Sequence, residues 1–91
     1  MTYALVFTDH YTRRARQFLK RHPELVRPYG KTLQLLELNP HHPSLRLHAL
    51  KGRLDGLHSV SINLSYRITL ELLIVDQEIV LVNVGDHDTV Y

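Results

Sequence analysis

The chain has 91 residues, of which 44% are hydrophobic and 22% charged, a composition typical of one small globular domain over residues 1–91. It holds no cysteine, which excludes disulfides and thiolate metal sites and fits a cytoplasmic protein. No run of about 18 apolar residues occurs, and the first residues lack a basic leader, so we expect neither a membrane span nor a signal peptide.

The net charge of +2 conceals two halves of opposite charge. Residues 1–54 hold ten Lys/Arg and three Asp/Glu, whereas residues 55–91 hold six Asp/Glu and a single cation, Arg67. A basic half suggests a polyanion partner such as nucleic acid. The alternative is that these basic side chains form a solvated helix face.

The first elements are a strand and a helix. Residues 2–8 form a compact apolar run, which predicts a strand. Asp9 is placed to act as the N-cap of a helix that runs to about His22. Apolar residues recur along this helix one or two turns apart, and basic residues occupy its other positions.

A second helical segment begins at Pro23. Pro28 interrupts its periodicity, so we expect one turn over 23–27 and the main helix over 28–38, or a kink at Pro28. Residues 39–56 form a long basic, histidine-rich connection, with three leucines expected to pin it to the core: Leu45, Leu47 and Leu50.

Three consecutive strands are predicted in the last third of the chain, over 57–64, 66–72 and 78–84. The first two alternate apolar and polar residues, and the short links between the three favour an antiparallel meander. One face is apolar and the other polar, with Arg67 in the middle of the polar face. We expect this polar face to be the working surface.

The element order predicts an α+β fold, β-α-α-β-β-β. Its antiparallel sheet comprises the N-terminal strand and the C-terminal three-strand meander, with a two-helix hairpin packed on one face.

Three stretches carry a resemblance to a known family: residues 42–52 (HPSLRLHALKG), 66–68 (YRI) and 84–91 (VGDHDTVY). Their order and spacing resemble the RelE/ParE toxin superfamily, in particular its RelE/StbE and YafQ-like branch, over essentially the whole chain. The resemblance implies a single toxin domain of a bacterial type II toxin-antitoxin, or plasmid stabilisation, system. Its expected partners are a cognate antitoxin, the ribosome and mRNA, with DNA contacted only through the antitoxin complex and no membrane.

The activity that the resemblance implies is metal-independent, ribosome-dependent cleavage of mRNA with no cofactor. The ribose 2′-OH attacks the adjacent phosphate, which needs a cation on the phosphate, an acid or base, and in-line placement. Arg67 matches the family's strand arginine, which contacts the scissile phosphate. The alternative is a surface arginine beside Glu71 on the same strand face.

Three further residues match catalytic positions of relatives. His87 matches a tail histidine of YafQ-like members that acts as acid or base; flanked by Asp86 and Asp88, it would otherwise be a solvated residue. Tyr91 matches a terminal aromatic that stacks a base or orients the site, or it is a frayed end. His42 matches a loop histidine.

We expect the RNA-binding surface to include Arg46, Lys51, Arg53, Ser59 and Ser61. The last two depart from the pattern, because RelE carries lysines on this strand. Fewer cations would weaken transition-state stabilisation, unless Lys51 or Arg53 reaches in.

Two other functions stay open, a ParE-like inhibitor of DNA gyrase without catalytic residues and an inactive relative that only binds antitoxin. Seven histidines raise the question of a metal site, but no His-x-x-x-His spacing occurs, so none is predicted.

Overall fold

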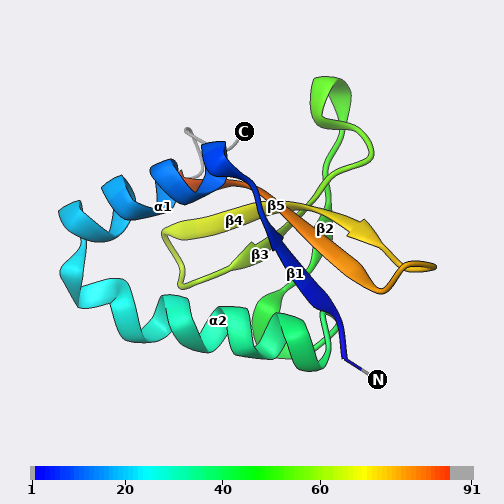
Figure 1. The fold of residues 1–91 in the computed structure, drawn as a ribbon, viewed down its shortest axis with the longest axis horizontal. Coiled ribbons are helices and arrows are strands. Elements are labelled where there is room, and N and C mark those ends of the chain that lie inside the picture. Colours follow the sequence, from blue (N-terminus) through cyan, green and yellow to red (C-terminus); the bar gives the residue numbers. More distant parts are fainter. Residues whose placement is uncertain (1, 87–91) are drawn as a thin grey trace.

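The computed structural model describes residues 2–86, in which two α-helices pack against a five-stranded sheet (Figure 1). The helices are α1 (Asp9–Arg21) and α2 (Val26–Leu38), and the strands are β1 (Ala4–Phe7), β2 (His48–Ala49), β3 (His58–Ser61), β4 (Tyr66–Leu73) and β5 (Glu78–Asp86). Short 3-10 helices form η1 (Pro23–Leu25), η2 (Pro43–Leu45) and η3 (Gly52–Leu54). The predicted α+β class and element order are confirmed. In the described part of the chain, no helix is both long and apolar enough to span a membrane.

The strand order is β1-β5-β4-β3-β2, and β3, β4 and β5 form the predicted antiparallel meander. Two details differ from the prediction. β1 pairs in parallel with β5, Leu5 opposite Ile79, so the sheet is mixed. β2, within the predicted connection, adds a fifth strand beside β3. Two helices and a long connection separate β1 from the meander. This long link allows β1 to run in either direction, whereas a tight hairpin would have required antiparallel pairing.

The helix α1 and its N-cap each begin one residue earlier than predicted. Thr8 is the N-cap, and its Oγ1 accepts a hydrogen bond from the backbone N–H of Tyr11 at 3.1 Å. Asp9, predicted as the cap, is the first helical residue, where its negative charge still favours the helix dipole.

The single turn predicted after Pro23 is η1, but α2 begins at Val26 and not at Pro28. Pro28 is the third residue of α2. The N–H groups of a first turn have no intrahelical acceptor, so a proline there removes no bond of the helix. The two helices run in opposite directions and are joined at the left of Figure 1.

The core lies between this helical hairpin and one face of the sheet. Tyr11, Phe18, Tyr29 and Leu36 from the helices meet buried residues of three strands, which are Val60, Ile68, Leu70, Ile79, Leu81 and Val84. The Tyr11 and Tyr29 hydroxyls share a buried hydrogen bond of 2.6 Å. Burial raises the pKa of both side chains above the ordinary 10.0, so both stay protonated at neutral pH.

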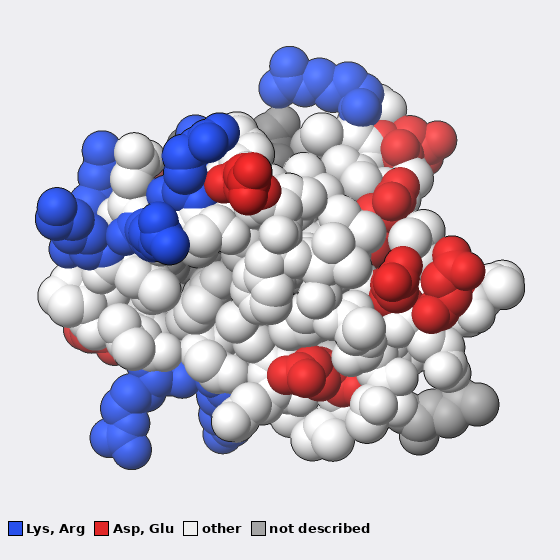
Figure 2. All heavy atoms as spheres, viewed as in Figure 1, with Lys and Arg blue, Asp and Glu red and all other residues white. Residues whose placement is uncertain are grey.

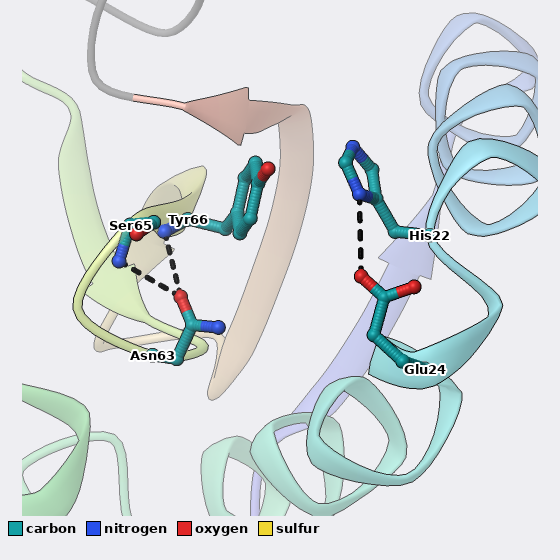
Figure 3. Close-up of polar contacts among 5 residues, drawn as sticks. All are labelled: His22, Glu24, Asn63, Ser65 and Tyr66. Atoms are coloured by element: carbon teal, nitrogen blue, oxygen red, sulfur yellow. Dashed lines mark hydrogen bonds and ion pairs between the residues drawn. The ribbon is translucent and has the colours of Figure 1, made fainter.

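The strand predicted over 57–64 is shorter than expected. β3 ends at Ser61, and Leu64, predicted to face the core, is 90% exposed. The chain turns here because the Asn63 Oδ1 accepts the backbone N–H groups of Ser65 and Tyr66, at 2.8 and 2.9 Å (Figure 3). This turn fixes the start of β4.

The long connection is anchored as predicted by two of its three leucines. Leu45 and Leu50 are 1% and 6% exposed, whereas Leu47 is half-buried and packs against the edge of the core. These anchors hold η2 beside β3 and so position residues of the candidate site.

Candidate functional site

Arg67 is the second residue of β4 and lies on the sheet face opposite the helices. Its neighbours across the sheet are Ser61 on β3 and Gly85 on β5. The next pair along this face is Ser59 and Thr69. Because Gly85 has no side chain, the β5 side of Arg67 carries no side chain directly opposite the arginine.

The Arg67 guanidinium is held by three hydrogen bonds. Its Nε donates to the Ser59 Oγ at 3.0 Å, its Nη1 to the Ser61 Oγ at 2.8 Å, and its Nη2 to the Arg46 carbonyl at 3.0 Å. A guanidinium has five N–H donors, so two have no acceptor within residues 2–86. Within residues 2–86 Arg67 forms no ion pair, with Glu71 or with any other acid. The structure therefore orients a cation without neutralising it.

The carbonyl that accepts a hydrogen bond from Arg67 belongs to Arg46, a residue with a left-handed backbone conformation. Arg46, with φ 50° and ψ 53°, ends η2. At the other end of η2, the His42 Nδ1 accepts the backbone N–H of Ser44 at 3.1 Å and caps the turn. Arg46 and His42 thus take part in the site through a backbone carbonyl and a cap. The Arg46 side chain itself is exposed.

Lys51 and Arg53 belong to a different part of the surface. They lie at η3, in a loop that projects from the sheet at the top right of Figure 1, and both are exposed. Neither is a hydrogen-bond partner of the Arg67 guanidinium, which is held by residues of β3 and η2. His87 and Tyr91 lie outside the described residues.

The sequence did not indicate that Ser59 and Ser61 accept hydrogen bonds from Arg67. The signal was present, since both serines fall on the polar face predicted for the strand that precedes β4. A pairing shifted by two residues would have kept them on the polar face beside other residues, and alternation alone does not exclude such a shift.

Two buried polar atoms lie close to this surface along the strands. Within residues 2–86, the Thr69 Oγ1 and the His58 Nδ1 have no hydrogen-bond partner. Thr69 is the cross-strand neighbour of Ser59 on the polar face, whereas His58 pairs with Leu70 and so falls on the opposite face.

No protein-family model and no curated protein matches this chain. Solved structures match it over nearly its full length. YafQ from E. coli superposes with a TM-score of 0.80, at 14% identity over 98% of each chain. The E. coli DinJ-YafQ toxin-antitoxin complex gives 0.79, at 17% identity over 100% of this chain and 99% of that one. The Staphylococcus aureus YoeB-YefM complex gives 0.72, at 18% identity over 96% and 99%.

The chain has the fold of the RelE/ParE toxins. The expected architecture is therefore confirmed for residues 2–86. Within this RelE/ParE fold, Arg67 lies on the central antiparallel strand of the sheet, on the face that the helical hairpin leaves open.

A metal centre finds no support in the described part of this RelE/ParE fold. Residues 2–86 contain no group of three or more His, Cys, Asp or Glu side chains placed to hold a metal ion. The chemistry available at Arg67 is that of an oriented guanidinium with no ion-pair partner among residues 2–86, which suits an anion such as a phosphate.

Proposed function

We propose that this chain is the toxin of a type II toxin-antitoxin system and that it cuts mRNA on the ribosome in the cytoplasm without a metal. The observation that carries the proposal is the Arg67 guanidinium, held by Ser59, Ser61 and the Arg46 carbonyl with two donors left over. The fold shared with YafQ and YoeB supports it.

In the proposed reaction, a ribose 2′-OH loses its proton and its oxygen attacks the adjacent phosphorus. The bond from phosphorus to the 5′-oxygen breaks, and that oxygen gains a proton. The products are a 2′,3′-cyclic phosphate and a free 5′-OH. Arg67 binds the non-bridging phosphate oxygens, where negative charge grows in the transition state.

His87 is the proposed general acid or general base of the reaction. Tyr91 is proposed to position the nucleobase next to the cleaved phosphate, and His42 to support the loop at η2. His87 comes two residues after Gly85, the cross-strand neighbour of Arg67. Two residues of chain span at most about 7 Å. This short connection supports a joint role for Arg67 and His87.

Ser59 and Ser61 stand where RelE carries lysines, and we propose that they compensate by orienting Arg67. A fixed guanidinium loses less side-chain entropy on binding a phosphate than a free one. Arg46, Lys51 and Arg53 are proposed to contact RNA beyond the cleaved phosphate.

The proposed partner is a cognate antitoxin with an acidic segment. YafQ and YoeB have been solved in complexes with DinJ and YefM, respectively. A segment covering the polar face of β3–β5 or the basic helical hairpin would block Arg67 or the approach of RNA to it, and DNA would be contacted through this complex.

The test is primer extension on a message translated in a cell-free bacterial extract, with the wild-type chain, Arg67→Ala and His87→Ala. Cuts within the reading frame that depend on translation and disappear in both variants support the proposal. An intact message with inhibited gyrase supercoiling would show a ParE-like toxin. An intact message with no growth arrest on expression would show an inactive, antitoxin-binding relative.

A further inference from the structure

A hollow lies between the last turns of α1 and the ends of β4 and β5, on the face of the sheet opposite Arg67. Its volume is about 310 Å³, at the small end of the range of about 300–1,000 Å³ found for ligand sites. It is lined by Arg14, Gln17, Phe18, Arg21 and His22 from the helix side and by Tyr66, Val84, Gly85 and Asp86 from the strands. We call this hollow the α1–β4 cleft.

Aromatic rings form one wall of the α1–β4 cleft. The Tyr66 ring packs edge-on against Phe18 at 5.2 Å between centroids, and it lies 4.8 Å from the His22 ring. In Figure 3, Tyr66 from β4 and His22 from the end of α1 point toward each other. His22 is held by Glu24, Nδ1 to Oε2 at 3.4 Å, and its side chain is 28% exposed. The aromatic wall of the cleft is therefore partly accessible to solvent at His22.

The other wall is basic. Arg14 and Arg21 line it, and within residues 2–86 neither forms an ion pair. Asp86 also lines the cleft, so the three charged side chains give it a net charge of +1. In the face drawn in Figure 2, basic side chains lie mainly on the left, where the two helices are joined, and at the top, and acidic side chains lie mainly on the right. Arg14 and Arg21 place the cleft beside the other basic side chains of α1.

The α1–β4 cleft is next to the Arg67 site along the chain. Tyr66 directly precedes Arg67, and adjacent strand residues point to opposite faces. Gly85 lines the cleft and is also the cross-strand neighbour of Arg67. A single RNA chain that passes around the ends of β4 and β5 would contact both the α1–β4 cleft and the Arg67 site.

We propose that the α1–β4 cleft binds one unpaired nucleotide of the RNA that Arg67 engages. The base lies against the Tyr66 and His22 rings, and a phosphate next to it contacts Arg14 and Arg21. Aromatic faces beside cations are the combination that single-stranded RNA uses, whereas an acidic peptide needs only the cations. The inference rests on the proposed function in taking RNA as the ligand.

The phosphate contact is tested by fluorescence anisotropy with a labelled, unstructured 2′-O-methyl oligoribonucleotide, which lacks the nucleophile for cleavage. Arg14→Gln/Arg21→Gln should weaken binding about tenfold and reduce the slope of log K against log salt by about 0.7, for the one phosphate that the two arginines contact. The matched control is Arg13→Gln/Arg16→Gln, which removes the same charge from the same helix outside the cleft. It should change affinity by no more than about twofold. Equal losses in both pairs would overturn the inference.

The base contact is tested with the same oligonucleotide in which one nucleotide is abasic. Tyr66→Leu should weaken binding of the intact RNA at least about fivefold, and Tyr66→Phe should retain it. The abasic change should weaken binding by the wild-type chain and not by Tyr66→Leu, a difference that a merely structural role of Tyr66 would not produce. Equal binding of intact and abasic RNA, with a polyglutamate peptide bound more tightly, would assign the cleft to an acidic protein segment and overturn the inference.

Cleavage during translation, measured in parallel, separates this inference from the nuclease proposal. RNA binding that depends on the cleft, without cleavage by the wild-type chain, supports the inference and counts against the nuclease. Cleavage that is unaffected in Arg14→Gln/Arg21→Gln and Tyr66→Leu, with unchanged RNA binding, overturns the inference alone.

Discussion

Arg67 shows how a single side chain is prepared for a ligand by neutral neighbours. Arginine has a long, flexible side chain, and three hydrogen bonds to Ser59, Ser61 and the Arg46 carbonyl fix its direction in the absence of a ligand. None of these partners carries a negative charge at the accepting atom, so the guanidinium keeps its full attraction for a phosphate.

Removing one of these hydrogen bonds should impair cleavage with little effect on folding. Ser61→Ala deletes the 2.8 Å acceptor of Nη1 on a half-buried strand residue. We expect cleavage to slow about tenfold, less than the ~10²–10³-fold expected for losing a transition-state donor itself. Single-turnover cleavage of a ribosome-bound message measures this. Ser44→Ala, an exposed serine that interacts through its backbone, is the control and should keep the wild-type rate.

The Tyr11–Tyr29 pair is the clearest polar contact of the core. Tyr11→Phe leaves the Tyr29 hydroxyl buried without its 2.6 Å partner, so unfolding should become easier by about 1–3 kcal/mol. Tyr11→Phe/Tyr29→Phe should cost less than the sum of the two single changes. Urea denaturation of the four proteins measures the coupling, and additive effects would show that the two hydroxyls do not stabilise each other.

The same pair makes stability depend on pH at the alkaline end. Burial raises the pKa of Tyr11 and Tyr29 in the folded chain, so the unfolded chain releases these protons first, near its ordinary pKa of 10.0. The stabilisation is complete below pH 10 and is lost as the pH rises above it. Between about pH 9 and pH 11, the wild-type chain should lose at least about 1 kcal/mol more of its free energy of unfolding than Tyr11→Phe/Tyr29→Phe. Parallel losses would contradict this.

At the scale of elements, α2 contains a glycine with no structural need to be one. A Cβ built on Gly30 meets no atom within 4 Å, and its φ is helical. Gly30→Ala should therefore raise the free energy of unfolding by about 0.5–1 kcal/mol. Gly56→Ala is the control: it also meets no atom, but its φ of +93° disfavours a side chain, so the same thermal unfolding measurement should show a loss. A loss in both would mean that Gly30 serves packing.

The elements divide into those that local pattern determines and those that it does not. Alternation predicted β4, whose apolar and polar residues obey the period of a sheet, and a nearly continuous apolar run predicted β5. It gave no pairing partner for β1, whose parallel contact with β5 depends on the path of the intervening helices. β2 has two residues and too little pattern to be seen. The early end of β3 depends on an Asn63 side chain that accepts backbone N–H groups.

For the whole molecule, the sequence predicted that Arg67 would lie on an open polar face, and the structure places it there. It did not predict that the arginine would be tied to η2, because that contact joins residues 21 positions apart through a backbone carbonyl. It also missed the α1–β4 cleft, since Phe18, His22 and Tyr66 meet only when the hairpin packs on the sheet. On the face drawn in Figure 2, basic side chains lie mainly on the left and acidic ones mainly on the right, as the opposite charges of the two halves of the sequence suggest.

The central claim is that Arg67 stabilises the phosphate during RNA cleavage. The most direct measurement is the single-turnover rate of cutting a ribosome-bound message by the wild-type chain, Arg67→Ala and Arg53→Ala. We expect Arg67→Ala to slow cleavage by about 10²–10³-fold and Arg53→Ala, an exposed arginine at η3, by less than about tenfold. Wild-type cleavage by Arg67→Ala would contradict the account and leave Arg67 as a structural residue of the sheet.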